Sequence, residues 1–428
     1  MRKFRSNARH EGKGFTRRKF LKVAGAAGAC ALLAEGPWFL RRVASAQEPI
    51  RIGNITPRTG FLGQEGSYGV LGAKMAVDEA NARGGVLGRP IELLMEDSVN
   101  PGVANQKATK LIEKNRVHVL TGEISSASAL AISEVAQRHK VLYFNTGANS
   151  DEIRSGSCHR YSFCVEGSNT MYVSAVARWL IREKKINRWY FLTADYAFGH
   201  DLYGVSSRFL EEHGGTNLGN DMVPTGTTDY SSYILKIMAA KPDMVFSCLA
   251  GIDITTFLKQ FREFGYPYEV AGGASSTVLF WAVGIEALSG VWQCMWYHKL
   301  DKPGVAEFTD RFRRRYGKPP ENCAWSDYTA INIYLEAVEK TGTTDCKELV
   351  EFLESGVTFD IMKGRPASFR KLDHQLMQPM FVVRMSNREE MEDEWDIFKV
   401  IEEVPRPDES LELIQIPAEE SRCDMEPL

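Results

Sequence analysis

The chain lacks the sequence motifs that identify most hydrolases, zinc proteases and nucleotide-dependent enzymes. No G-x-S-x-G, H-E-x-x-H or G-x-x-x-x-G-K-[ST] run occurs in its 428 residues, and its eight histidines are scattered. Gly60, Gly63 and Gly66 follow the first expected strand, but their spacing differs from the dinucleotide fingerprint G-x-G-x-x-G. We therefore expect no enzymatic activity, no cofactor and no bound metal.

Cysteine is also sparse, and no two of the eight have the C-x-x-C spacing of zinc ribbons or thioredoxin-like motifs. Seven follow residue 46, namely Cys158, Cys164, Cys248, Cys294, Cys323, Cys346 and Cys423. An odd number leaves at least one cysteine unpaired. Cys158 and Cys164 are the nearest pair, but the sequence does not fix the connectivity.

The first 46 residues are typical of an export signal. A basic start leads to Arg17-Arg18 with Phe-Leu-Lys behind them, an apolar segment over 23–33, and a small-residue site ending at Ala46. This pattern resembles a twin-arginine signal, so we expect cleavage after Ala46 and a mature protein in the periplasm. A membrane anchor and lipidation at Cys30 are the alternatives, but the apolar segment is shorter than the ~20 residues that span a bilayer.

The near-neutral net charge of −3 hides two segments of opposite sign. Residues 1–46 hold 11 Lys and Arg against 2 Asp and Glu. The remaining chain therefore has 41 basic and 53 acidic residues, a net charge of −12. Such a chain repels polyanions, which argues against a nucleic-acid partner. It also has no run of 18 consecutive apolar residues, so we expect the mature chain not to span a membrane.

Strands and helices alternate along the mature chain in two successive runs. The expected strands are Ile50–Ile55, Ile91–Met95, Val117–Leu120, Val141–Phe144, Trp189–Thr193 and Met244–Leu249. Helical periodicity lies between them, as over Gly69–Arg83 and Leu202–Glu212. This alternation predicts an α/β fold with two lobes, each built on a doubly wound parallel sheet.

Ligands of such sheets bind beyond the carboxyl ends of the strands, so the loops after the strands are the candidate sites. These loops are Thr56–Tyr68, Gly122–Ser128, Asn145–Asp151, Ala194–Gly199, Ala250–Asp253 and Gly272–Thr277.

Several motifs together resemble one family, the periplasmic leucine/isoleucine/valine-type substrate-binding proteins of ABC importers. The two most specific are Gly84-Gly85-Val86-Leu87-Gly88-Arg89-Pro90 and Asp195-Tyr196-Ala197-Phe198-Gly199, and the match extends from about Pro49 to Val383. The resemblance implies a type I periplasmic binding protein fold, whose lobes are joined by three crossovers and close on a small solute. We place the crossovers near Val165–Asn169, Met295–His298 and Arg365–Pro379.

The implied domains follow from these crossovers. The first lobe comprises 47–167 and 298–365, the second comprises 168–297 and 366–387, and an acidic tail over 388–428 is expected to wrap the surface or fray.

The resemblance also implies ligand contacts. The family's carboxylate contacts correspond to Ser126 and to the segment from Gly147 to Asn149, and Tyr196 is expected to cover the solute. A helix N-terminus at Ser126 would favour an anion. The structural alternatives are that Ser126 caps its helix, that Tyr196 is a packing residue, and that Asp253 is an N-cap rather than a ligand contact.

One departure from the family concerns charge. Amino-acid binders place an acidic residue near Ala274, whereas this segment is uncharged, and Glu65 stands where the family has an aromatic residue. A buried ammonium without a carboxylate is costly, so an α-amino acid is expected only if Asp253 or Glu65 substitutes. A carboxylate without an amine, an aromatic acid, and an amide or urea-like solute stay open.

The sequence thus predicts a monomeric solute-binding protein that delivers a small carboxylate- or amide-bearing metabolite to an ABC permease in the inner membrane. The alternative is a ligand-sensing module of the same fold that acts on a receptor or regulator.

Overall fold

The computed structural model describes residues 47–428 except 274–275, so the predicted export signal and its cleavage site lie outside the described residues. The first lobe is built on five parallel strands: β1 (Ile50–Thr56), β2 (Ile91–Asp97), β3 (Val119–Gly122), β4 (Leu142–Asn145) and β5 (Ser162–Cys164). Their order in the sheet is β2-β1-β3-β4-β5. The apolar residues of β1, β3 and β4 are fully buried, as expected for a parallel sheet covered by helices.

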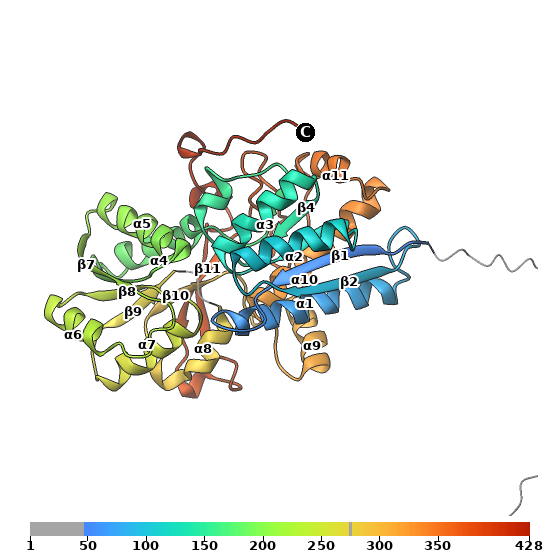
Figure 1. The fold of residues 1–428 in the computed structure, drawn as a ribbon. Coiled ribbons are helices and arrows are strands. Elements are labelled where there is room, and N and C mark those ends of the chain that lie inside the picture. The colour runs from blue at the N-terminus through green and yellow to red at the C-terminus, as the bar shows by residue number, and fades with distance from the viewer. Residues whose placement is uncertain (1–46, 274–275) are drawn as a thin grey trace, which may run out of the picture. The chain divides into compact units, whose positions relative to one another are not determined.

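Helices α1 (Gly63–Ala82), α2 (Pro101–Glu113) and α3 (Ser126–His139) connect these strands. Three later helices, α9 (Val305–Tyr316), α10 (Asn322–Thr341) and α11 (Cys346–Leu353), return to this lobe, where α10 packs along α1 (Figure 1). Gly72 of α1 permits this packing, because a Cβ there would lie 1.9 Å from the carbonyl oxygen of Ala324 in α10.

The second lobe contains four parallel strands in the order β7-β6-β8-β9, and this confirms the predicted α/β fold. The strands are β6 (Arg188–Ala194), β7 (Thr216–Val223), β8 (Met244–Cys248) and β9 (Glu269–Gly272). The helices of this lobe are α4 (Asn169–Arg182), α5 (Ala197–Glu212), α6 (Ser231–Ala240), α7 (Gly251–Glu263) and α8 (Thr277–Val283).

Part of the segment expected to be a C-terminal tail belongs to a third sheet. Strands β10 (Val291–Cys294), β11 (Met380–Met385) and β12 (Phe398–Val404) pair antiparallel in that order. β12 lies within residues 388–428, for which the sequence predicts only a tail. It forms because each residue of β12 finds a backbone partner on β11, apart from one bulge.

The chain passes between the two parallel-sheet lobes three times. The first passage joins β5 to α4, the second joins β10 to α9, and the third joins α11 to β11. Within the predicted third crossover, Arg365–Pro379, the Phe369 ring packs against Phe144 and Phe163 of the first lobe.

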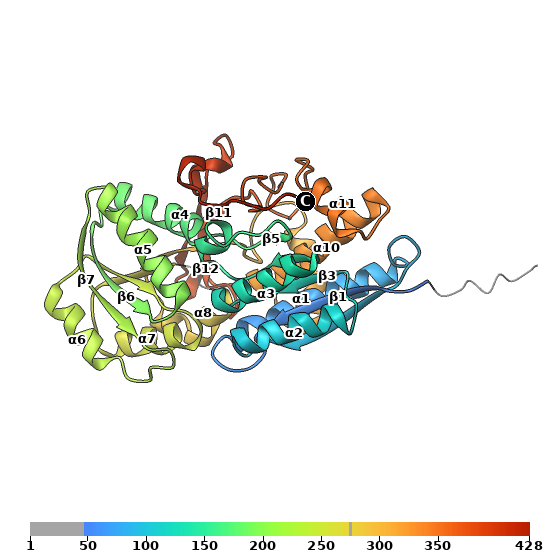
Figure 2. The same ribbon diagram turned by 45° about the horizontal axis from the view of Figure 1, so that its top comes forward.

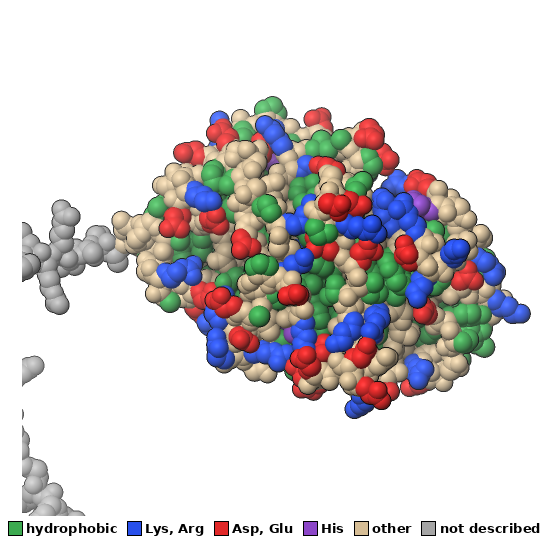
Figure 3. All heavy atoms as spheres, turned by 180° about the vertical axis from the view of Figure 1, so that it is seen from behind, with side chains coloured by type: hydrophobic (Ala, Val, Ile, Leu, Met, Phe, Trp, Pro, Cys, Tyr) green, Lys and Arg blue, Asp and Glu red, His purple; other side chains and the backbone are tan. Residues whose placement is uncertain are grey.

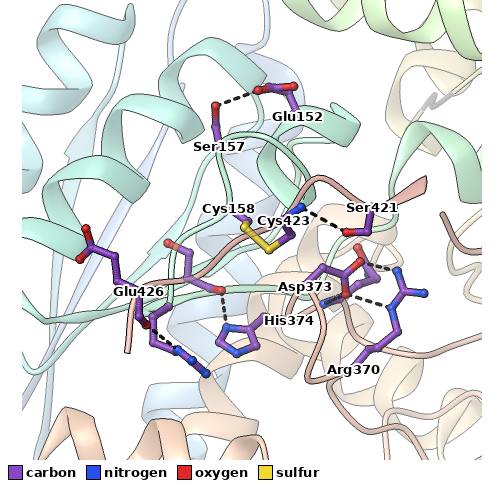
Figure 4. The surroundings of a disulfide bond; sticks show 12 residues. Glu152, Ser157, Cys158, Arg370, Asp373, His374, Ser421, Cys423 and Glu426 are labelled. Atoms are coloured by element: carbon purple, nitrogen blue, oxygen red, sulfur yellow. Dashed lines mark hydrogen bonds and ion pairs between the residues drawn. A yellow bond between two sulfur atoms is a disulfide. The ribbon is translucent and has the colours of Figure 1, made fainter. Parts of the chain in front are cut away.

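The C-terminal segment returns from the third sheet to the first lobe (Figures 1 and 2). Arg178 of α4 donates a hydrogen bond to the carbonyl oxygen of Leu413, and Ile414 is fully buried. A disulfide then joins Cys423 to Cys158, whose Cα atoms are 5.5 Å apart (Figure 4). Cys158 therefore pairs across 265 residues rather than with its neighbour Cys164, which is a free buried thiol.

The surface of the described residues carries charges of both signs. On the face seen in Figure 3, acidic and basic side chains are interspersed. Within the part of the chain that is described, no helix is both long and apolar enough to cross a membrane.

Candidate ligand-binding site between the lobes

A cavity of about 40 Å³ lies where loops at the carboxyl ends of both parallel sheets meet. The first lobe contributes Glu65, Gly147 and Asn149, together with Asn322 from the start of α10. The second lobe contributes Tyr196, Phe198, Ala250 and Ser276, and the first crossover contributes Glu166. The cavity therefore has the location that the strand-end rule predicts for a ligand.

Glu65 is placed in the cavity by the start of α1. The helix begins directly after the loop that follows β1, and it approaches this loop so closely that only glycine fits at position 66. A Cβ on Gly66 would lie 1.8 Å from the carbonyl oxygen of Pro57. Glu65 is 4% exposed, and burial raises the pKa of its carboxyl to about 7. Its Oε2 has no hydrogen-bond partner within the described part of the chain.

Glu166 is held on the other side by its own hydrogen bonds. Its Oε1 accepts from the Tyr172 hydroxyl at 2.7 Å, from the Gly167 N–H at 2.9 Å and from Asn149 Nδ2 at 3.2 Å. Burial raises the pKa of this carboxyl to about 6. These bonds fix one oxygen of the carboxylate in the first crossover.

The loop after β4 forms the floor of the cavity and is rigidly held. Asn145 Oδ1 accepts from the N–H groups of Gly147 and Ala148, at 3.3 and 2.9 Å. A Cβ on Gly147 would lie 2.8 Å from the carbonyl oxygen of Glu123, so the two backbone segments approach as only glycine allows.

Tyr196 closes the cavity from the second lobe. It precedes α5 as the N-cap residue, and its ring meets Phe61 of the first lobe edge to face, with centroids 6.1 Å apart. Gly251 of α7 also touches Phe61, because a Cβ there would lie 2.6 Å from the Phe61 carbonyl oxygen. Further along the interface, the Asp151 N–H donates to Oδ2 of Asp201 in α5 at 2.9 Å. The two lobes are therefore in contact beside the cavity.

Two of the predicted ligand residues do not line the cavity. The Ser126 hydroxyl oxygen accepts from the Ser150 N–H at 3.2 Å and so supports the cavity floor from behind. Both Asp253 oxygens accept from the Gly226 N–H, at 3.1 and 3.0 Å, within the second lobe. Direct contact of either side chain with a solute stays a prediction.

The capping alternatives for these residues are wrong. Ser125, not Ser126, occupies the N-cap position of α3, and Ala250, not Asp253, occupies that of α7. Ala274 lies outside the described residues.

The cavity thus brings together four of the predicted residues, Glu65, Gly147, Asn149 and Tyr196. Sequence reasoning missed Glu166, Tyr172, Ser276, Asn322 and Cys323. Glu166 was detectable in principle, because it lies in the predicted first crossover. Asn322 is the first residue of α10, and only the packing of α10 against α1 brings it to the cavity.

Comparison with known proteins places the chain among relatives of the same architecture. The model of the periplasmic binding protein family matches residues 49–390. The Leu/Ile/Val-binding protein homolog 7 of Brucella abortus (strain 2308) is 28% identical over 340 residues, which cover 76% of this chain and 84% of the Brucella protein.

Two solved structures illustrate the likeness. A periplasmic binding protein from Burkholderia mallei has a TM-score of 0.81 at 26% identity and covers 88% of this chain and 98% of its own. A solute-binding protein of an ABC transporter from Rhodopseudomonas palustris BisB5, in complex with 3,4-dihydroxybenzoic acid, shares the fold. Its TM-score is 0.74 at 21% identity, over 83% of this chain and 97% of its own.

Proposed function

The chain belongs to the periplasmic binding protein family, and we propose that it captures a small carboxylate- or amide-bearing metabolite and delivers it to an ABC permease in the inner membrane. The observation that carries this proposal is the cavity between the lobes, which is lined by strand-end loops of both sheets. The protein performs no reaction in this role and acts in the periplasm, after export by the predicted twin-arginine signal.

Closure of the lobes is the physical basis of capture. A solute that touches both lobes stabilises the closed state relative to the open one, and the permease then distinguishes the two states. Tyr196 supports this view, because it lines the cavity and also contacts Phe61 of the other lobe. Gly147 and Asn149 supply the opposite wall, and Ser126 supports their loop through Ser150.

The experiment is a thermal-shift screen of residues 47–428 against leucine, 3,4-dihydroxybenzoate, acetamide and related metabolites. A solute at about 100 times its dissociation constant stabilises the folded state by about 2.7 kcal/mol. Tyr196→Ala is the matched variant and is expected to remove the shift while the unliganded protein still melts cooperatively. If no member of a broad metabolite panel stabilises the protein, the proposed function is wrong.

A further inference from the structure

The cavity is acidic and has no cationic side chain in its wall. Glu65 and Glu166 line it from the first helix and the first crossover, and no Lys, Arg or His belongs to the lining of the described residues. A carboxylate that is removed from water normally needs a positive partner or several hydrogen-bond donors. Such groups must come either from neighbouring side chains or from the solute.

Two buried cations, Arg154 and Lys363, lower the pKa of the Glu166 carboxyl through their charge, but their hydrogen bonds go to other groups. The guanidinium of Arg154 donates to the carbonyl oxygens of Ser150, Ala148, Glu166 and Gly167 and to Oε1 of Gln375. The Lys363 ammonium donates to Gln378 Oε1 at 2.9 Å and to the Pro379 carbonyl oxygen at 2.8 Å. Neither side chain donates to Glu65 or to the carboxylate of Glu166.

Several acceptors in the wall also lack donors. Among the residues that the structure describes, Glu65 Oε2, Asn322 Oδ1 and Ser276 Oγ have no hydrogen-bond partner, and these side chains are 4%, 7% and 7% exposed. A buried acceptor without a donor costs free energy, so a partner that brings N–H groups is favoured at this place. A solute carboxylate brings only acceptors and would add a like charge beside two carboxylates.

We propose that Glu65 and Glu166 select a solute whose head group carries several N–H donors, such as an amidinium, an ammonium or a primary amide, and reject the isosteric carboxylate. This inference rests on the proposed function and narrows its solute class. Glu65 offers Oε2, which has no partner among the described residues, from the first helix. Glu166 is held in place by the three hydrogen bonds that its Oε1 accepts from Asn149, Gly167 and Tyr172. The head group lies between them.

Cavity size adds a second restriction. An apolar cavity of about 150 Å³ binds benzene in another protein. The cavity here is about 40 Å³, so it favours a small aliphatic solute over an aromatic one.

The test uses solutes that have nearly the same shape but differ in charge and donors. Binding of acetate, acetamide and acetamidinium to residues 47–428 is measured by titration calorimetry, and benzoate, benzamide and benzamidinium form a second set that varies size. We expect acetamidinium to bind most tightly, acetamide next and acetate least. Tightest binding of the carboxylate in either set overturns the inference but leaves the proposed function standing. Absence of binding in both sets also overturns the inference, and the wider metabolite screen then decides the proposed function separately.

Variants assign the selectivity to the two carboxylates. Glu65→Gln and Glu166→Gln each keep the side-chain shape and are expected to weaken acetamidinium binding about ten- to hundred-fold, since hydrogen bonds to charged groups are the strong ones. Binding of acetamide changes less, so the two affinities converge. The control is Asp327→Asn, because Asp327 is another buried carboxylate of the first lobe, bonded to Asn54 and absent from the cavity wall. Equal losses in all three variants contradict the assignment, and the solute sets in the unaltered chain test the inference even if a variant does not fold.

Discussion

The disulfide between Cys158 and Cys423 is expected to contribute measurably to stability, because it joins the C-terminal segment to the first lobe. Non-covalent contacts also hold the end of the chain, including the packing of Leu428 against the core. Arg422 pairs with Glu152 at 2.9 Å through exposed side chains, and Arg160 donates to the Glu426 carbonyl oxygen at 3.0 Å. Replacing both cysteines by serine removes the covalent link and leaves these contacts in place.

The size of the effect follows from the length of the closed loop. The two cysteines are 265 residues apart, and the chain-entropy model gives an upper value of about 5–6 kcal/mol for a loop of that length, while measured contributions are typically about 2–4 kcal/mol. Unfolding entropy near the melting temperature is about 2.1 cal/mol/K per residue, which gives about 0.8 kcal/mol/K for residues 47–428. The expected fall in Tm is therefore about 3–5 °C.

The assay is thermal unfolding followed by circular dichroism, with and without a reducing agent. Reduction is expected to lower the Tm of the unaltered protein to that of the double variant and to leave the double variant unchanged. Cys346→Ser is the control, since this thiol is free and its loss leaves the reductant effect intact. An unaltered protein whose Tm does not respond to complete reduction, verified by thiol titration, refutes the reasoning.

Three further predictions concern the cavity and its supports. Glu65 lies near Glu321 and Tyr196, and its pKa in the folded state is raised to about 7. The folded state therefore binds more protons than the unfolded state between about pH 5 and pH 8. For this reason the free energy of unfolding is expected to fall as the pH rises over that range. Amidinium affinity is expected to rise over the same range, and parallel melting and calorimetry series check both signs. Gly66→Ala is expected to cost about 1–3 kcal/mol in denaturant unfolding, whereas Gly204→Ala, with open space around it, is neutral or stabilising. Asp253→Asn is expected to lower the Tm, because both of its carboxylate oxygens accept from the Gly226 N–H. Calorimetry on the same variant tests the predicted contact with the solute, and an unchanged affinity removes Asp253 from the site.

The parts of the fold that could be predicted from sequence are those with a local signal. β1 alternates apolar with polar residues and β4 is a short, mainly apolar run, so these local patterns are enough to find both strands. β7 reads Thr-Asn-Leu-Gly-Asn-Asp-Met-Val and lies at a sheet edge, where polar residues hide a strand. β12 depends on pairing with β11, and such pairing of separate segments leaves no periodic signal of its own.

The residues of the candidate site also divide into those with a local sequence signal and those that only tertiary packing brings to the cavity. Glu65, Asn149 and Tyr196 follow strands, and the rule on strand ends is enough to identify their loops from the amino-acid sequence. Glu166 and Asn322 reach the cavity through a crossover and through a helix that packs back from a distant part of the chain. The disulfide belongs with this second group, because its two cysteines lie 265 residues apart.

Arg154 explains how the cavity stays acidic beside a buried cation. Its guanidinium is directed at main-chain oxygens of the cavity floor and the first crossover and at Gln375, so it holds these segments together without pairing with a carboxylate. It also bonds the carbonyl oxygen of Glu166 rather than the side chain, so Arg154 makes no direct hydrogen bond to the Glu166 carboxylate. The Arg154 charge still lowers the pKa of the Glu166 carboxyl, but burial is the larger effect and raises that pKa to about 6. An Arg154 side chain turned toward Glu166 would neutralise one of the two carboxylates and remove the preference for donors.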